Sequence, residues 1–160
     1  MPGLCPREDS PEMNIVLPSS GDEPRIRQLL ALCGLPHEDL TPEHLSHFWV
    51  MKEKGEIVGT VGLEIHGRSA LLRSLAVDPC FRKRGFAQQL TEKAEGYATS
   101  LKIEELYLLT VTAESFFLKR GYQRIERNSA PPAIQGTAEF QGLCPVSSVL
   151  MIKQLKGNRI

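Results

Sequence analysis

The 160-residue sequence has no excess of charge of either sign and no long apolar run. Nineteen basic and nineteen acidic residues cancel to a formal net charge of zero, so no overall field would attract nucleic acid or an anionic membrane. A transmembrane helix needs roughly 18 consecutive apolar residues, and no such stretch occurs. The first residues also contain no apolar segment of signal-peptide length. We therefore predict a cytoplasmic protein without nucleic-acid or membrane partners.

Patterns typical of metal and nucleotide sites are also missing. The four cysteines, at positions 5, 33, 80 and 144, lie far apart, and neither they nor the four histidines have the spacing of a metal site. We interpret the cysteines as reduced thiols and predict no metal. No Gly-Lys-Ser/Thr and no Gly-x-Gly-x-x-Gly is present, so P-loop and dinucleotide-binding proteins fit poorly.

The length and the 41% apolar content predict one domain with its own core. Residues 1–12 contain three prolines and three acidic residues without periodicity, which predicts a disordered tail before a single domain at 13–160. Apolar patterns predict strands at 13–17, 48–51, 57–65, 70–77, 105–109, from 122 and at 148–152. They predict helices at 22–33, from 41, at 86–98, 113–119 and 132–141. The strand–helix–strand order from 70 to 109 indicates an α/β fold.

Residues 75–87 join a buried strand, a basic loop and a helix start, and they carry the clearest chemical signal. The first turn of a helix has unpaired N–H groups and partial positive charge, so it can bind a diphosphate. Gly85 and Ala87 would let the backbone approach the phosphate oxygens closely. Three cations, Arg82, Lys83 and Arg84, could add charge-assisted hydrogen bonds. The alternative is an ordinary solvated turn before a helix.

The pattern Arg82-x-x-Gly85-x-Ala87, after a strand that ends in Val77-x-Pro79, resembles the CoA-binding signature of GNAT acetyltransferases. A second GNAT pattern combines a polar residue that ends the next strand, an alanine, an aromatic pair and a glycine followed by an aromatic residue. It is matched here by Thr110, Ala113, Phe116, Phe117, Gly121 and Tyr122. The two patterns occur in the family's order, and the resemblance covers about residues 13–153.

The resemblance implies a GNAT fold: a mixed, twisted sheet of six to seven strands with about four helices, whose central parallel strands splay around CoA. Acetyl-CoA would be the co-substrate. Backbone groups of Leu75, Ala76 and Val77 would hydrogen-bond the pantetheine arm, which Thr110, Ser115 and Phe117 would flank. The diphosphate would be held by backbone amides of Arg82, Lys83, Arg84, Gly85, Phe86, Ala87 and Gln88.

The same resemblance implies direct acetyl transfer to an amine, with a backbone N–H near Val77 as oxyanion donor. Many GNAT enzymes have a tyrosine where this chain has Phe117, so water or Ser115 would protonate the leaving thiolate. The sequence favours Glu64 as the base, because it is the one carboxylate in an apolar strand and a buried carboxylate holds a proton more readily. The alternatives are a solvent-facing Glu64 and a Glu64–Arg73 pair.

Arg73 and Ser74 are polar residues inside an otherwise apolar strand, and alternation would place them on opposite faces. If Arg73 faces the acceptor cavity, it could bind a substrate carboxylate in a bidentate manner, and Ser74 and Glu64 could contribute to the same site. That arrangement favours an amino acid or an analogue as acceptor. A structural ion pair of Arg73 is the alternative.

Further segments, among them Cys33-Gly34-Leu35-Pro36 and Leu143-Cys144-Pro145, resemble N-acetyltransferases associated with bacterial arsenic-resistance operons. A related branch acetylates amino-acid analogues that carry a phosphorus or arsenic acid. The predicted function is N-acetylation of a small primary amine. The resemblance to GNAT enzymes also favours a homodimer. Two alternatives stay open: a non-catalytic CoA-binding domain, suggested by Phe117, and an arsenic(III) binder or sensor using two or three of Cys33, Cys80 and Cys144.

Overall fold

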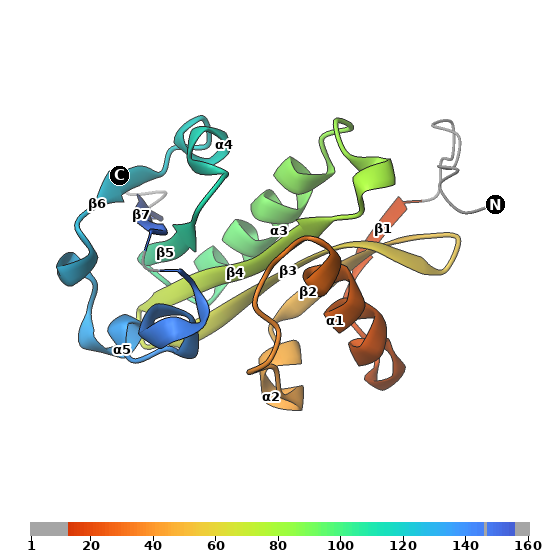
Figure 1. The fold of residues 1–160 in the computed structure, drawn as a ribbon, viewed down its shortest axis with the longest axis horizontal. Helices are drawn as coiled ribbons and strands as arrows, with labels where there is room; N and C mark the ends of the chain where they lie inside the picture. Colours follow the sequence, from red (N-terminus) through yellow and green to blue (C-terminus); the bar gives the residue numbers. More distant parts are fainter. Residues whose placement is uncertain (1–12, 146, 156–160) are drawn as a thin grey trace. The chain divides into compact units, whose positions relative to one another are not determined.

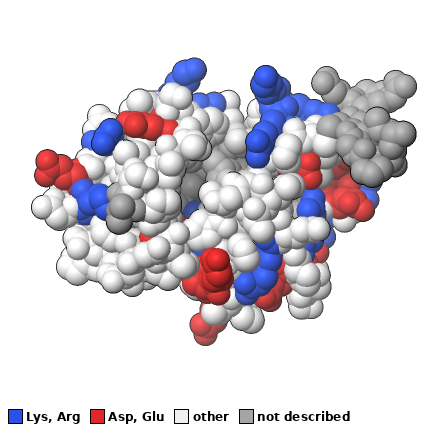
Figure 2. All heavy atoms as spheres, viewed as in Figure 1, with Lys and Arg blue, Asp and Glu red and all other residues white. Residues whose placement is uncertain are grey.

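The structure is a computed structural model that describes residues 13–145 and 147–155. The predicted tail, 1–12, lies outside the described residues. None of the helices in the described part has the length and apolar character needed to cross a membrane. On the face shown in Figure 2, basic and acidic side chains are interspersed among uncharged ones, in keeping with the net charge of zero.

Seven strands in the described part form one sheet with the order β1-β2-β3-β4-β5-β7-β6 (Figure 1). The strands are β1 Met13–Val16, β2 Phe48–Glu53, β3 Glu56–His66, β4 Ser69–Val77, β5 Glu105–Thr110, β6 Gln123–Ile125 and β7 Val149–Gln154. The pairing of β4 with β5 is parallel, whereas the β1–β2, β2–β3, β5–β7 and β6–β7 pairings are antiparallel. The mixed sheet predicted from the family resemblance is thereby confirmed.

The α-helices are α1 Glu23–Leu32, α2 Pro42–Leu45, α3 Phe86–Ser100, α4 Glu114–Leu118 and α5 Pro132–Gln135. Shorter helical turns occupy Ser20–Asp22, Pro79–Phe81, Arg127–Ser129 and Glu139–Leu143. The helix expected at 132–141 is divided: α5 ends before Gly136, and the side chain of Thr137 then organises the next turn. Its hydroxyl donates to the Ile134 carbonyl (2.8 Å) and accepts from the Phe140 N–H (3.3 Å).

By its internal contacts the chain divides into two compact units. The first contains the described residues up to Gly62 together with Ser74–Lys93. Its core forms where the apolar stripe of α1 packs on β2 and β3, and it includes Ile26, Leu30 and Phe48. A Cβ at Gly62 would collide with the Phe48 ring, so glycine is needed for this packing.

The second unit contains Leu63–Arg73 and the described residues from Ala94 onward. Its core joins β4, β5 and β7 to α5, through Leu71, Tyr107, Ile134 and Leu150. In this unit the described pairing of β4 with β5 ends at Leu71 and Tyr107, whereas the pairing of β5 with β7 continues to Thr110. The last three residues of β5 therefore pair with β7 and not with β4.

Candidate active site

The basic loop of the first unit has a backbone shaped to present amides. Lys83 and Gly85 adopt left-handed conformations, with φ of 66° and 81°, and α3 begins at the next residue, Phe86. A Cβ on Gly85 would meet no atom within 4 Å, so the backbone here faces open space. The first intrahelical bond joins the Gln89 N–H to the Gly85 carbonyl (3.1 Å). Helix geometry thus leaves the N–H groups of Phe86 and Ala87 without an intrahelical acceptor.

Asp78 and Arg25 hold the beginning of this loop. The Asp78 carboxylate accepts from the Cys80 N–H (2.9 Å), and the Asp78 N–H donates to the Val58 carbonyl (2.8 Å). Arg25 lies 3.2 Å from the second carboxylate oxygen of Asp78 and also donates through Nε and Nη2 to the Ile57 carbonyl, at 3.1 and 2.9 Å. The loop is therefore tied to both α1 and β3 in the first unit.

Arg82 points back along the loop toward the end of β4. Its Nε donates to the Val77 carbonyl at 3.1 Å, and its Nη2 lies 3.4 Å from the Cys33 sulfur. The Cys33 thiol contacts the same carbonyl at 3.7 Å. Sequence reasoning grouped Arg82 with two further phosphate-binding cations, whereas this geometry assigns its side chain a contact with the backbone. Its predicted amide contact with a diphosphate does not depend on the side chain.

The other two cations of the loop differ from Arg82 and from each other. The Arg84 guanidinium stacks on two aromatic rings, at 5.0 Å from the Phe81 centroid and 6.0 Å from the Phe86 centroid. Lys83 is exposed. Stacking leaves the edge of a guanidinium accessible to an anion. The cationic role of Arg84 and Lys83 therefore stays a prediction that this geometry allows.

The last part of β4 departs from regular strand geometry at one residue. Ser74 is buried and adopts a left-handed φ of 60°, which is strained for a residue with a side chain. The alternation that was expected to send Arg73 and Ser74 to opposite faces is interrupted at that point. Beyond it, Ala76 and Val77 are buried and Leu75 is partly buried, as expected of a strand that forms the wall of a site.

In the second unit, three predicted pantetheine contacts follow the end of β5. The Thr110 hydroxyl accepts from the Ala113 N–H (3.0 Å) and so turns the chain into α4. Ser115 is exposed in the first turn of that helix. Phe117 is buried, with its ring edge-on to Phe116 (5.0 Å) and Tyr122 (5.3 Å). Phe117 is thus a core residue packed between the rings of Phe116 and Tyr122.

Tyr122 is the one tyrosine next to Phe117, and its hydroxyl is already engaged. It donates to Glu95 at 2.8 Å, and Lys153 lies 3.2 Å from the same carboxylate. Burial and the neighbouring Glu95 raise the pKa of Tyr122. A tyrosine in these surroundings is poorly placed to protonate a leaving thiolate, so Tyr122 does not take the place of the tyrosine that many GNAT enzymes have at the position of Phe117.

A buried ionic cluster surrounds Arg73 in the second unit. The guanidinium, with an exposed fraction of 0%, lies 2.5 Å from Glu64 through Nη1 and 3.2 Å from Glu139 through Nε. His66 approaches the other oxygen of Glu64 at 3.6 Å. The alternatives left open for both residues, a Glu64–Arg73 pair and a structural role of Arg73, match this geometry. The substrate and base roles stay predictions, and a substrate carboxylate would have to displace Glu64 or Glu139 from Arg73.

Sequence reasoning missed Glu139 as a partner of Arg73, and it did not connect Cys144 with this cluster. The Cys144 thiol lies 3.6 Å from Glu139, and burial together with that carboxylate raises its pKa to about 12. The lone arginine in an apolar strand did indicate that a partner was needed. No spacing in the sequence indicates that the second partner comes from the segment before β7.

The three cysteines within the described residues differ in state. Cys33 and Cys144 are free, but Cys80 is disulfide-bonded, so the interpretation of every cysteine as a reduced thiol is wrong for Cys80. An arsenic(III) site uses thiolates. Use of Cys80 in such a site would need reduction of its disulfide, and use of Cys144 would need ionisation of a thiol whose raised pKa opposes the thiolate. The arsenic-binding alternative stays a prediction with these two requirements.

Comparison with known proteins identifies the family and supports the fold described above. Residues 44–124 match the family model described as an acetyltransferase (GNAT) domain, which is just over half of the chain. The chain therefore belongs to the GNAT acetyltransferase family. An uncharacterized N-acetyltransferase of Chlorobaculum tepidum is 34% identical over 93 residues, which cover 58% of this chain and 59% of that protein.

An amino-acid acetyltransferase of Pseudomonas syringae pv. tomato is 28% identical over 105 residues, covering 64% of this chain. The chain spans 24% of the length of that relative, as against 59% of the Chlorobaculum protein. Among solved structures, N-acetylglutamate synthase of Neisseria gonorrhoeae, complexed with coenzyme A and N-acetyl-glutamate, has a TM-score of 0.79 at 22% identity. The match covers 92% of this chain and 36% of that one. At this identity the likeness shows the fold.

Proposed function

We propose that the protein is an acetyl-CoA-dependent N-acetyltransferase that acts on a primary amine of a small molecule, of the amino-acid type. The observation that carries the proposal is the loop between β4 and α3, where left-handed Lys83 and Gly85 precede a helix start in a member of the GNAT family. A loop that displays amides at the N-terminus of a 15-residue helix suits a diphosphate. These residues fit CoA chemically.

In this proposal the amides of Arg82–Gln88 bind the diphosphate, and backbone groups of Leu75–Val77 bind the pantetheine arm. Thr110, Ser115 and the ring of Phe117, which is buried, flank the same arm. The group bound there supplies an acetyl thioester. During transfer the amine nitrogen bonds to the acetyl carbon and the carbon–sulfur bond breaks. The amine loses one proton while the sulfur gains one.

The protein would contribute positioning, proton transfer and stabilisation of the oxyanion. The Val77 N–H is the proposed oxyanion donor, and Glu64 is the proposed base. One Glu64 oxygen contacts Arg73 and the other faces His66, so the oxygen toward His66 is better placed to accept a proton. Ser115, exposed in the first turn of α4, or water would return a proton to the sulfur.

The proposed acceptor class rests on the related proteins and on the sequence resemblance. One relative is named an amino-acid acetyltransferase, and a structural neighbour is a synthase of N-acetylglutamate. The resemblance to arsenic-operon proteins adds amino-acid analogues with phosphinic or arsinic acids as candidates. A cytoplasmic location and a homodimer remain predictions of the sequence.

The test is release of free CoA from acetyl-CoA in the presence of amino acids, their phosphinic and arsinic analogues, and simple amines. We expect turnover with at least one carboxylated amine, together with acetyl-CoA binding measured by calorimetry. If acetyl-CoA does not bind, the proposal is wrong. If acetyl-CoA binds but no amine is acetylated, the second candidate, a non-catalytic CoA-binding domain, is favoured instead. The specific observation for that candidate is Phe117, which cannot donate a proton.

The role of Glu64 needs its own comparison. Glu64→Gln keeps the side-chain shape and should lower kcat by about 100-fold or more, because general bases contribute about 10²–10⁴-fold. The acid limb of the pH profile of kcat/KM should also disappear, which a purely structural residue would not cause. The matched control is Glu104→Gln, on an exposed glutamate. Equal kcat in both variants would exclude Glu64 as the base.

A further inference from the structure

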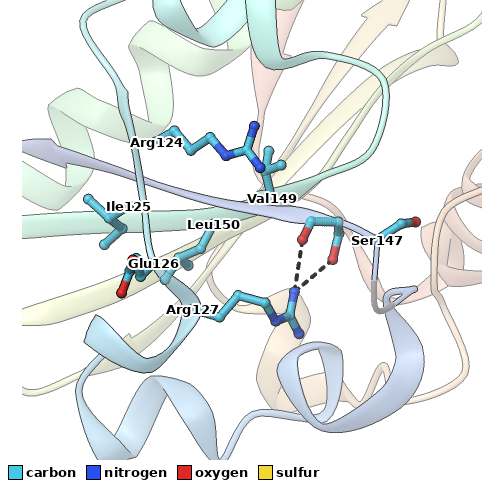
Figure 3. Close-up of a pocket in the computed structure, with 8 residues that line it drawn as sticks. Arg124, Ile125, Glu126, Arg127, Ser147, Val149 and Leu150 are labelled. Atoms are coloured by element: carbon cyan, nitrogen blue, oxygen red, sulfur yellow. Dashed lines mark hydrogen bonds between the residues drawn. The ribbon is translucent and has the colours of Figure 1, made fainter.

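A pocket of about 670 Å³ opens in the second unit between the end of β6 and the start of β7 (Figure 3). The pairing of β6 with β7 ends at Ile125 and Leu150, and the pocket lies at that end of the pairing. Its volume is in the range of small-molecule sites. It is lined by Arg124, Ile125, Glu126, Arg127, Ser147, Ser148, Val149 and Leu150.

Arg127 is held rigidly at the edge of this pocket. Its Nη1 donates to both the carbonyl (2.9 Å) and the hydroxyl (3.1 Å) of Ser148, as the dashed lines in Figure 3 show. The Ser148 hydroxyl in turn donates to the Pro145 carbonyl (2.6 Å), and the guanidinium lies 4.8 Å from the Phe140 ring centroid. Within the described residues, the Nε and Nη2 groups of Arg127 have no hydrogen-bond acceptor. A preorganised guanidinium with donors to spare can bind a carboxylate.

The remaining charges of the pocket favour an anion with an apolar part. Arg124 is 63% exposed, and its guanidinium is 3.8 Å from Glu114, too far for a hydrogen bond. Glu126 also lines the pocket, but in Figure 3 its carboxylate points away from the guanidinium of Arg127. Ile125 and Val149, which are partly buried, supply apolar surface to the pocket, and the core residue Leu150 lies behind them. Two cations, one acid and an apolar floor suit a small organic acid.

The pocket lies next to a residue of the proposed active site. Val149 is the register partner of Thr110 across the β5–β7 pairing, so their Cα atoms are separated by about 5 Å. We infer that this pocket is the acceptor's carboxylate subsite, with Arg127 as its main ligand and Arg124 as its second cation. This inference rests on the proposed function. It gives Arg127 the role that sequence reasoning gave to Arg73, whose guanidinium is buried between two carboxylates.

The inference predicts a specific loss of discrimination between acids and amides. Each amino acid that is turned over is compared with its α-amide, through the ratio of the two kcat/KM values. Arg127→Ala should lower this ratio by about ten- to a hundredfold, because a hydrogen bond to a charged group is lost. Arg124→Ala should lower it less, since its side chain is more exposed. The KM for acetyl-CoA should not change in either variant.

Two controls separate binding from folding. Arg127→Lys keeps the charge without the planar fork and should recover part of the ratio. Arg68→Ala removes an arginine that is 81% exposed and should leave the ratio unchanged. If Arg127→Ala lowers kcat/KM equally for acid and amide, or changes neither, the pocket is not the carboxylate subsite.

A binding measurement keeps the inference testable if no amine is acetylated. Glutarate is titrated into the ¹⁵N-labelled protein while the amide signals of Ser147, Ser148 and Val149 are followed by NMR. Saturable shifts that vanish in Arg127→Ala would support an organic-acid site even though the proposed activity had failed. Absence of shifts in the wild type, or shifts unchanged in Arg127→Ala, would overturn the inference.

Discussion

Two arginine-centred networks, one in each unit, use the same side chain in opposite ways. In the first unit Arg25 and Arg82 donate to main-chain carbonyls around the loop between β4 and α3, and the one carboxylate in contact with Arg25, that of Asp78, is partly exposed. In the second unit Arg73 is buried between two carboxylates, Glu64 and Glu139. The first arrangement shapes a backbone, and the second neutralises charge. A neutral carbonyl tolerates loss of its arginine far better than a buried carboxylate does.

Removal of Arg73 should therefore have the largest effect on stability. Arg73→Ala leaves two buried carboxylates without their shared cation, and we expect the free energy of unfolding to fall by about 3–5 kcal/mol. Arg25→Ala in the first unit should cost about 1 kcal/mol, since its side chain is 31% exposed. Urea denaturation of both variants measures the difference. Similar losses would mean that the two networks are energetically alike.

The free cysteines of the two networks should differ in reactivity. At pH 8 a thiol reagent should modify Cys33, which is partly exposed, well before Cys144, which is buried and has a pKa of about 12. Cys144 should react only after unfolding. Spectrophotometric titration of native Cys33→Ser and Cys144→Ser tests this order. Rapid modification of Cys144 itself in native Cys33→Ser would contradict it.

The raised pKa of Cys144 also predicts a pH dependence of stability. The folded protein holds the thiol proton more tightly than the unfolded chain, where the pKa is 9.0. The contribution is thus fully present below pH 9 and is lost as the pH rises from 9 toward about 12. Denaturant unfolding at pH 8 and pH 10.5 should show a smaller loss of stability in Cys144→Ala than in the wild type. An equal loss in both would exclude this contribution.

Two glycine substitutions test whether the loop between β4 and α3 binds acetyl-CoA through its backbone amides. Gly85→Ala places a side chain on a residue with φ of 81° and should destabilise the protein by about 1–2 kcal/mol and weaken acetyl-CoA binding. Gly96→Ala, in the interior of α3 with open space around its Cβ, should stabilise the protein by about 0.5–1 kcal/mol. Calorimetry measures both the stability of each variant and its affinity for acetyl-CoA. Equal acetyl-CoA affinity in the two variants would argue against an amide-based diphosphate site.

The smallest effect is expected for the side chain of Arg82. Because it contacts the Val77 carbonyl, Arg82→Ala should raise the KM for acetyl-CoA by only a few-fold, through a less ordered loop. Lys83→Ala should weaken acetyl-CoA binding in a salt-dependent manner, as an exposed cation would. Isothermal titration of acetyl-CoA at two salt concentrations distinguishes the two variants. If the affinity for acetyl-CoA depends strongly on salt in the wild type and this dependence is lost in Arg82→Ala, the Arg82 side chain contacts a phosphate directly.

Most elements of the fold could be predicted from apolar periodicity and turn residues, and the observed ends of β2, β3, β4 and α3 lie within a few residues of expectation. The helix expected at 132–141 was divided because the side chain of Thr137 competes for backbone partners. The left-handed Ser74 could not be foreseen either, since nothing in its neighbours favours that conformation.

The sequence by itself determined the loop at 82–87, because its conformation depends on glycine, small residues and a helix start that are adjacent in the chain. Only the tertiary structure decided that Arg82 turns back to Val77, that Glu139 joins Arg73, and that Arg127 borders an open pocket. Buried charges take whatever partners the fold brings near them, and those partners lie far away in the chain. Local patterns therefore sufficed to predict the cofactor loop, whereas the proposed acceptor site could be argued only from the fold.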